Sequence, residues 1–333
     1  MKILNGMSIG IVVSLIPSAM LGQIATTLNW GEINIFLNVC TSLMCFLMGI
    51  CIAIQYKLDP ISSCSLAMAT MLAGGSIHGI NEEGFFQLKG AGDVINATIG
   101  AIIAVILIKY LAHRLGAYKL LVIPVLVVVV VGLITSFTAE PIAQITTFIG
   151  LLIEKFTTLQ PYLMSMLIAL SFALIIISPI STVAVALLIN LSGNGSAAAN
   201  IGIAAAALTL AILSYKTNGL GTALAHFIGS PKIQMANFIK SPKMIIPSLI
   251  SALICSIVVP IFNLQGTPMS AGFGISGLIG PLGNLGINGF TTINIVITLL
   301  TFIIIPTIVS YIISFICKDR LKLVDSEDYR LNI

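Results

Sequence analysis

Long apolar runs, most of them close to 20 residues, follow one another along almost the whole of this 333-residue chain. Only 8% of the residues are charged and 58% are hydrophobic, whereas a soluble domain carries about 25% charged residues. One helical crossing of a bilayer needs about 20 apolar residues, whereas a β-barrel strand alternates over about ten. The sequence therefore predicts an all-α, polytopic membrane protein and excludes a soluble enzyme.

The order of the apolar runs predicts about ten spans in two halves. The expected spans are roughly residues 4–28, 33–54, 60–77, 94–112, 119–138, 162–177, 180–192, 196–214, 245–263 and 291–316. Between the halves, residues 141–161 place apolar residues at helical spacing between two prolines, which predicts an amphipathic helix at the membrane interface. The expected organisation is a scaffold half (1–140), this linker (141–161), a substrate half (162–317) and a tail (318–333).

Basic residues are distributed unevenly over the expected loops. With ten crossings and both termini in the cytoplasm, every lysine and arginine except Lys89 and Lys155 falls on the cytoplasmic side. This is the bias that orients membrane proteins, so it favours ten spans with cytoplasmic termini. It also explains the excess of basic residues, so no nucleic-acid partner is needed to account for them.

Residues 264–290 are too apolar for an ordinary loop. They carry no charge, and glycine occupies every third position from Gly274 to Gly289. A collagen helix would need many more repeats and much more proline. Within a membrane, irregular backbone persists only where it is buried in protein or lines a wet cavity. The pattern predicts a re-entrant hairpin that enters from outside.

The second half of the chain lacks acids. No Asp or Glu occurs between Phe156 and Lys318. Carriers coupled to protons or sodium usually keep a carboxylate within the membrane, because a cation there needs a compensating charge. A half that is polar only through uncharged side chains, histidine and backbone suits a neutral polyhydroxyl solute or an anion, which helix N-termini and unwound N–H groups can hold.

Uncharged polar side chains gather around a Gly193/Gly195 break and in the 264–290 stretch, and carboxamides match the hydroxyls of a sugar. The candidate substrate-binding residues are Asn190, Asn194, Ser196, Asn200, Asn218, His226, Gln265, Thr267, Asn284 and Asn288. His226 could bind a solute hydroxyl or accept its proton. The alternative is that these residues cap broken helices and that His226 is a packing residue. No catalytic residue, metal site or cofactor is assigned, and the six cysteines lack metal-ligand spacing.

Four stretches carry a resemblance to a known family. They are Ser178-Pro-Ile-Ser181, Gly193-Asn-Gly-Ser196 with its alanine-rich continuation, Ser230-Pro-Lys-Ile-Gln234 and the run from Gly266 to Gly274. In these the chain resembles the membrane-embedded IIC component of bacterial phosphotransferase-system (PTS) sugar transporters. It is most similar to the divergent stand-alone branch that includes the perfringolysin O regulator-like proteins.

The resemblance implies a glucose-type IIC fold with ten spans in two halves, re-entrant hairpins, interfacial helices and a dimer built largely by the first half. Sugar-phosphorylating members use a histidine and a hairpin glutamate, often in a Thr-Glu-Pro context. Here the comparable string, Ala139-Glu140-Pro141, lies in the linker. His226 is the candidate for the histidine. Because no IIA or IIB domain is recognisable, any phosphoryl donor is expected to be a separate protein.

Two functions follow as hypotheses. The first is a permease of the bacterial plasma membrane that carries a small polar solute, a sugar or a small anion, by an elevator-type movement of the second half. The alternative is a non-transporting sensor that keeps the IIC fold and signals to a cytoplasmic partner. For the sensor, the tail 318–333 carries both signs of charge, although a solvated chain end would do the same.

Overall fold

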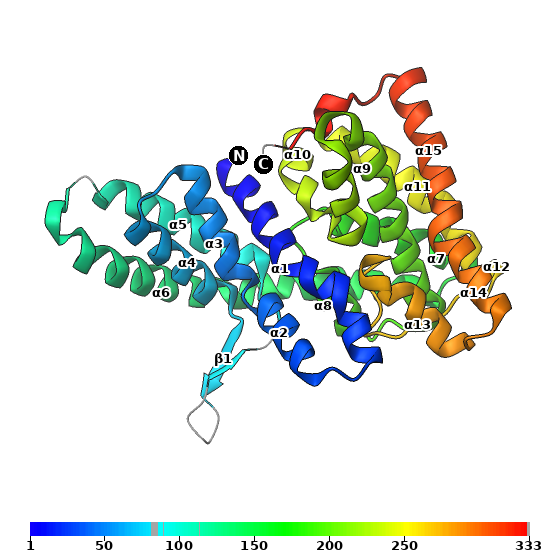
Figure 1. Ribbon diagram of the computed structural model, residues 1–333, viewed down its shortest axis with the longest axis horizontal. Coiled ribbons are helices and arrows are strands. Elements are labelled where there is room, and N and C mark those ends of the chain that lie inside the picture. Colours follow the sequence, from blue (N-terminus) through cyan, green and yellow to red (C-terminus); the bar gives the residue numbers. More distant parts are fainter. Residues whose placement is uncertain (81–85, 89, 113, 332–333) are drawn as a thin grey trace. The chain divides into compact units, whose positions relative to one another are not determined.

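The computed structural model describes residues 1–80, 86–88, 90–112 and 114–331. Contacts divide the chain into two compact units, Met1–Ile145 and Thr146–Asn332. In the described residues nearly all regular structure is helical (Figure 1). The predicted all-α, polytopic class is confirmed. Lys89, which the charge analysis places outside, lies beyond the described residues.

The first unit is built mainly from five helices and the first part of a sixth. Its elements are α1 (Lys2–Thr27), α2 (Gly31–Ser42), α3 (Met44–Tyr56), α4 (Pro60–Gly74), β1 (Ile77–Ile80), β2 (Phe86–Leu88), α5 (Val94–Ala112), the 3₁₀ helix η1 (Gly116–Tyr118) and the start of α6 (Lys119–Glu154). β1 and β2 pair antiparallel, with Ile77 opposite Leu88. The sequence analysis does not predict these strands.

Local signals fix the ends of α4. Pro60 occupies its first turn, and the Asp59 carboxylate caps it by accepting from the Ser62 backbone N–H at 3.2 Å. Gly75 ends it in the left-handed conformation. Asp59 also pairs with Lys119 at the start of α6. Partial burial opposes ionisation of Asp59, but the hydrogen bonds from Lys119 and Ser62 outweigh it and lower the pKa of Asp59 to about 2.

Helices α1 and α3 approach each other backbone to backbone. A Cβ atom on Gly6 would lie 2.6 Å from the Cα of Ile52, and one on Gly10 would lie 2.5 Å from the Cα of Met48. Only glycine fits at such a distance, so these two positions set the contact between the helices. Small residues therefore replace interdigitating side chains here.

The second unit surrounds α9. Its elements are the end of α6, η2 (Lys155–Thr158), α7 (Pro161–Ile175), α8 (Thr182–Leu188), α9 (Gly193–Ile228), η3 (Pro231–Gln234), α10 (Met235–Lys240), η4 (Pro242–Ile245), α11 (Ile246–Ser256), α12 (Val258–Ile261), η5 (Ser276–Leu278), α13 (Ile279–Asn288), α14 (Thr292–Leu299), the π-helix η6 (Leu300–Ile304), α15 (Ile305–Phe315), the π-helix η7 (Ile316–Arg320) and η8 (Ser326–Tyr329). Helices α7, α11 and α15 pack against α9 (Figure 1).

Helix α9 is buried because its first part consists of small residues. Ala197–Ala199 and Ala204–Ala207 are buried, and a Cβ on Gly202 would lie 2.4 Å from the carbonyl oxygen of Ala169 in α7. At Gly219 the backbone leaves the helical region, with φ of 81°. The kink separates a first part of α9 inside the bundle from a distal part that carries His226.

By length and composition, six helices in the described part of the chain can cross a bilayer, and α2 with α3, bent by 51°, would make a seventh. The remaining three of the ten expected spans form α4, α7 and α8, with 15, 15 and 7 residues. At about 1.5 Å per residue, each is shorter than the roughly 30 Å hydrocarbon layer.

The expected interfacial helix 141–161 is not a separate element. Helix α6 runs from Lys119 to Glu154, with Pro141 inside it, and the boundary between the units falls within this helix. A proline in a membrane helix is tolerated where the freed backbone groups find other partners, so Pro141 does not end the helix as the sequence analysis expects.

Candidate functional site

The glycine segment, residues 264–290, folds against the start of α9. Its backbone takes positive φ at Gly272, Gly274 and Gly277, then forms η5 and α13, and Gly289 ends α13 with φ of 89°. The backbone N–H of Gly193 donates to the carbonyl of Gly266 at 2.8 Å. The segment is therefore a succession of tight turns and a short helix, packed against the rest of the second unit.

Asn200 organises the tightest part of this segment. Its Oδ1 accepts three consecutive backbone N–H groups, from Gly272 at 3.1 Å, Phe273 at 3.2 Å and Gly274 at 3.0 Å. Its Nδ2 donates to the carbonyl of Ser270 at 3.0 Å, and the side chain is fully buried. Converging N–H groups form a concavity that can hold an anion. Here a neutral amide oxygen fills it.

Two further α9 residues fasten the beginning of the segment. Asn194 Nδ2 donates to the carbonyl of Leu264 at 2.7 Å, and Ser196 Oγ donates to that of Thr267 at 2.9 Å. The first two turns of α9 thus satisfy carbonyls that no helix or strand would satisfy. Each of these contacts matches the capping role that is the alternative to solute binding.

The amides of the segment bond to one another as well. Asn284 Oδ1 accepts from the backbone N–H of Gln265 at 2.9 Å, and its Nδ2 donates to Thr298 at 2.8 Å. Asn288 donates to Asn284 Oδ1 at 3.0 Å, and Gln265 Nε2 donates to Asn263 at 2.7 Å. The structure thus brings a large part of the predicted set together. These residues are Asn194, Ser196, Asn200, Gln265, Thr267, Asn284 and Asn288.

The remaining three predicted residues lie elsewhere. Asn190 is exposed after α8, in the left-handed conformation. Asn218 and His226 lie toward the end of α9. Asn218 donates to the tail at the carbonyl of Tyr329, and His226 is linked to the same carbonyl through Gln234. His226 Nδ1 lies 2.7 Å from the carbonyl of Thr222, and its Nε2 lies 3.0 Å from Gln234 Nε2. Both ring nitrogens are therefore engaged, with Nδ1 as the donor to the carbonyl.

Two breaks in the helices meet beside the glycine segment, and we name this place the junction. Thr182, at the start of α8, donates to the carbonyl of Gly272 at 2.7 Å. Ser276 donates to the carbonyls of Ile228 and Gly229, at 2.9 and 3.0 Å, where α9 ends. The α7–α8 break, the glycine turns and the end of α9 therefore converge in one region of the second unit.

Lys232 supplies the charge of the junction. Its side chain is only 7% exposed, and its ammonium donates to the carbonyls of Ser178 at 2.6 Å and Ile180 at 2.7 Å, in the α7–α8 break. Burial lowers the pKa of Lys232 to about 7. Its partners are backbone carbonyls, and in the described residues its ammonium forms no ion pair. The ammonium therefore binds two carbonyl dipoles, and in the described residues no carboxylate pairs with its charge.

The sequence analysis treats Lys232 as one of several cytoplasmic lysines and misses it as a site residue. The available signal is its position in Ser230-Pro-Lys-Ile-Gln234, where apolar or uncharged residues surround one cation in an acid-free half. Its burial depends on the distant α7–α8 break, which a local pattern does not reveal. Within the described residues, no group of three or more His, Cys, Asp or Glu side chains could hold a metal ion.

Long apolar helices, broken helices and a buried glycine-rich turn system define a polytopic α-helical membrane protein of the carrier type. The sequence profile described as "Phosphotransferase system, EIIC" matches residues 1–331, so the chain belongs to the phosphotransferase-system EIIC family. The predicted family is confirmed. At the family level this means a PTS-type permease, embedded in the membrane with multiple spans, that acts with IIA and IIB components. No curated protein and no solved structure matches the chain significantly.

Proposed function

We propose that this EIIC protein carries a small polar solute, a sugar or a small anion, which binds at the junction. The observation that carries the proposal is that the α7–α8 break and the end of α9 converge on the glycine segment, through Thr182 and Ser276. Lys232 adds a buried cation on the α7–α8 break. Membrane carriers bind solutes where helices are interrupted, because half-helix ends and unwound backbone offer free polar groups. Irregular backbone at such a place is tolerated because it lines a cavity or is buried in protein.

Of the two solute classes, the charge balance favours the anion. Lys232 is buried without an acidic partner, and no Asp or Glu occurs in the sequence between Phe156 and Lys318. A buried cation without a counter-charge attracts a negative group, and lysine is a common ligand of phosphate and carboxylate groups. The lysine uses two of its three N–H donors on Ser178 and Ile180, which leaves one for a ligand.

We infer the mode of transport from the division of the molecule. The second unit contains the junction, and the first unit contains the close α1–α3 contact and the exposed, apolar first part of α6. In the proposed mechanism the first unit is a scaffold that forms a homodimer, and the second unit carries the solute by an elevator-type movement. Both termini would lie in the cytoplasm of a bacterium, as the distribution of lysine and arginine favours.

Uptake by proteoliposomes tests the proposal. The panel contains neutral sugars, sugar acids and phosphate, each measured with the wild type, Lys232→Met and the control Lys240→Met, whose lysine is exposed. For an anionic solute we expect Lys232→Met to raise KM at least tenfold and Lys240→Met to leave it unchanged. Equal KM values for the two variants would exclude Lys232 as an anion ligand. Absence of uptake and of any ligand-induced shift in Tm across the panel would refute the permease.

A second candidate function is a sensor on the same fold, and the state of His226 favours it. Both nitrogens of this histidine are engaged within the protein, by Thr222 and Gln234. A histidine held in this way does not offer a free base to a solute hydroxyl. This argues against phosphorylation of the solute with His226 as the base. A sensor would bind a solute from the panel, with a shift in Tm, and show no uptake into proteoliposomes.

A further inference from the structure

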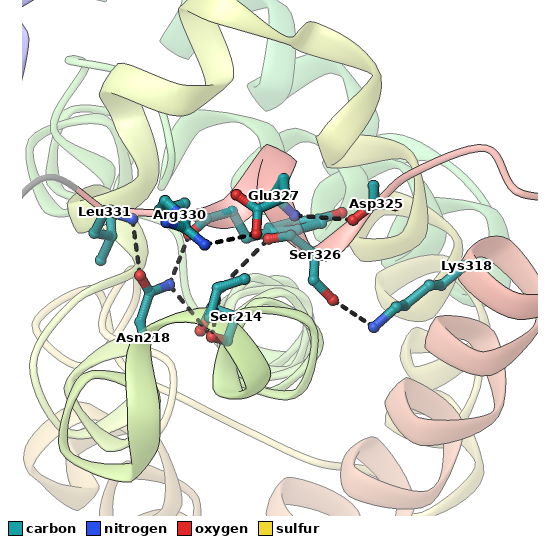
Figure 2. A network of polar contacts seen from close by, with 10 residues as sticks. Ser214, Asn218, Lys318, Asp325, Ser326, Glu327, Arg330 and Leu331 are labelled. Atoms are coloured by element: carbon teal, nitrogen blue, oxygen red, sulfur yellow. Dashed lines mark hydrogen bonds and ion pairs between the residues drawn. The ribbon is translucent and has the colours of Figure 1, made fainter.

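The C-terminal tail is an ordered, docked segment. After η7 the chain turns at Lys322, which has φ of 49°, and then forms η8. Asp325 caps η8 by accepting from the Glu327 N–H at 3.1 Å, and Asp328 accepts from the Asp325 N–H at 2.9 Å. Figure 2 shows this turn lying over α9 near Ser214 and Asn218, just before the Gly219 kink, with Arg330 and Leu331 beyond it. A solvated chain end, the alternative considered for the tail, would make no such contacts.

Three carboxamides bind the backbone of the tail. Asn218 donates to the carbonyl of Tyr329 at 2.7 Å and accepts from the N–H of Leu331 at 2.8 Å, in the two-point manner of a neighbouring strand (Figure 2). Gln234 donates to the same carbonyl at 3.1 Å, and Asn237 donates to that of Arg330 at 2.9 Å. These contacts recognise the main chain of residues 329–331, where the chain leaves η8, and do not depend on its side chains.

Two side chains of the tail have their own partners. Tyr329 is fully buried, and its hydroxyl donates to the carbonyl of Met244 at 2.8 Å. Asp328 accepts from Ser241 at 3.1 Å and lies 3.3 Å from the ammonium of Lys243. Although partial burial opposes its ionisation, these hydrogen bonds and Lys243 lower the pKa of Asp328. The surroundings therefore select an acidic residue followed by an aromatic one.

We propose that the surface formed by Asn218, Gln234, Asn237, Ser241, Lys243 and Met244, the tail cleft, is a peptide-binding site. Its ligand class is an acidic–aromatic peptide that forms a 3₁₀ turn followed by an extended end, and in this structure the chain supplies that ligand itself through residues 325–331. The inference is independent of which solute, if any, is transported. The contacts reach main chain, one carboxylate, one tyrosine and the Ser326 hydroxyl, which accepts from the Lys318 ammonium (Figure 2). Because residues 325–331 themselves contain all these groups, a separate peptide of the same sequence satisfies the contacts equally well.

The tail cleft is connected to the site residue His226. Gln234 donates to the tail at Tyr329 and also faces His226 Nε2, while its Oε1 accepts from Asn237 at 2.7 Å. These three contacts fix the orientation of one amide. Removal of the tail takes away one of them and leaves Gln234 held by His226 and Asn237 alone.

Binding in trans by the full-length chain tests the proposal. A fluorescent peptide with the sequence of residues 324–331 is titrated, with anisotropy as the readout, into wild type, Tyr329→Ala and the control Tyr311→Ala, whose tyrosine is 64% exposed on α15. We expect Tyr329→Ala to bind at least tenfold more tightly than the other two, because its own tail no longer fills the cleft. A peptide with alanine in place of its tyrosine should not compete.

Equal affinity in the three proteins, or equal competition by the alanine peptide, would overturn the proposal. Hydrogen exchange in the wild type keeps the test independent of how Tyr329→Ala folds. Unlabelled peptide at about ten millimolar exceeds the roughly millimolar effective concentration that a short connection provides. The peptide should then displace the tail and accelerate exchange at the N–H of Leu331. Unchanged protection of that N–H with saturating peptide would also overturn the proposal.

Discussion

In the first unit α1 and α3 meet through glycine and bare backbone, whereas in the second unit α9 and the glycine segment meet through carboxamides. Gly6 and Gly10 bring α1 onto the backbone of α3, and no polar side chain is needed at that contact. Asn200 instead holds three N–H groups of the glycine segment, far from α9 in sequence. The difference teaches that continuous helices need only close packing, while interrupted ones need side chains that replace the lost backbone hydrogen bonds.

The largest expected effect is the loss of stability when a buried carboxamide is replaced, and it should differ between the two units. Asn200→Leu should lower the free energy of unfolding by about 3–5 kcal/mol, because three buried N–H groups lose their acceptor. The matched control is Asn96→Leu in the first unit, where Asn96 donates to the carbonyls of Ala73 and Thr135 and accepts from the Thr138 hydroxyl. It should cost only about 1–2 kcal/mol, because no backbone N–H group loses its acceptor and the Thr138 hydroxyl can still donate to the carbonyl of Thr135. Unfolding in mixed micelles by titration with SDS measures both, and equal losses would contradict the comparison.

The second prediction concerns the glycine contact. Gly10→Ala should lower the free energy of unfolding by about 2–3 kcal/mol, because a Cβ 2.5 Å from the Cα of Met48 forces the helices apart. Gly132→Ala in α6 is the control, since no atom lies within 4 Å of the added Cβ. The control should be neutral or stabilising by up to about 1 kcal/mol. A similar fall in Tm for both variants would show that helix flexibility, and not the close contact, matters.

The third prediction uses the charge of Lys232. Its pKa in the folded protein, about 7, lies below the ordinary value of about 10.4, so the unfolded chain binds more protons between these values. The contribution of Lys232 to stability should therefore rise as the pH increases from 7 to 10. Lys232→Met should remove this rise and cost about 1–2 kcal/mol at pH 10, where the amine still donates to two carbonyls. Stability measured against pH for both proteins checks this; parallel curves would contradict it.

The smallest expected effect lies in the first unit. Asp59→Asn keeps an oxygen to cap α4 but loses the charge that pairs with Lys119, and should cost about 0.5–1 kcal/mol at pH 7. Because the pKa of Asp59 is lowered to about 2, its contribution is present above about pH 4 and is lost as the pH falls toward 2. Thermal unfolding at pH 7 and pH 3 should thus show a smaller difference between wild type and variant at the lower pH.

Run length and hydropathy were sufficient to predict the helical class and the position of most long helices. They failed at Pro141, because the rule that proline ends a helix is relaxed in membrane helices, where other groups can satisfy the backbone that proline frees. They also failed to separate the short helix α8 from a span, because an apolar segment buried in protein and one buried in lipid have the same composition.

The candidate site was predictable only in part, for a related reason. The amides of the glycine segment stand out in an apolar chain, and the structure brings Asn194, Ser196 and Asn200 onto that segment. The solute role of the predicted residues stays a prediction. Lys232 was missed because its burial depends on carbonyls more than 50 positions away along the chain. Charge counts along a sequence cannot distinguish a lysine in water from one inside the protein.

The isolated ammonium of Lys232 has an electrical consequence. An elementary charge that crosses a membrane potential of 100 mV gains or loses about 2.3 kcal/mol. If the second unit moves across the membrane without a solute and with Lys232 protonated, that step is voltage-dependent. An anion bound beside the ammonium cancels the charge and removes the dependence. The current recorded with and without solute would then report how many charges travel with the empty and the loaded carrier.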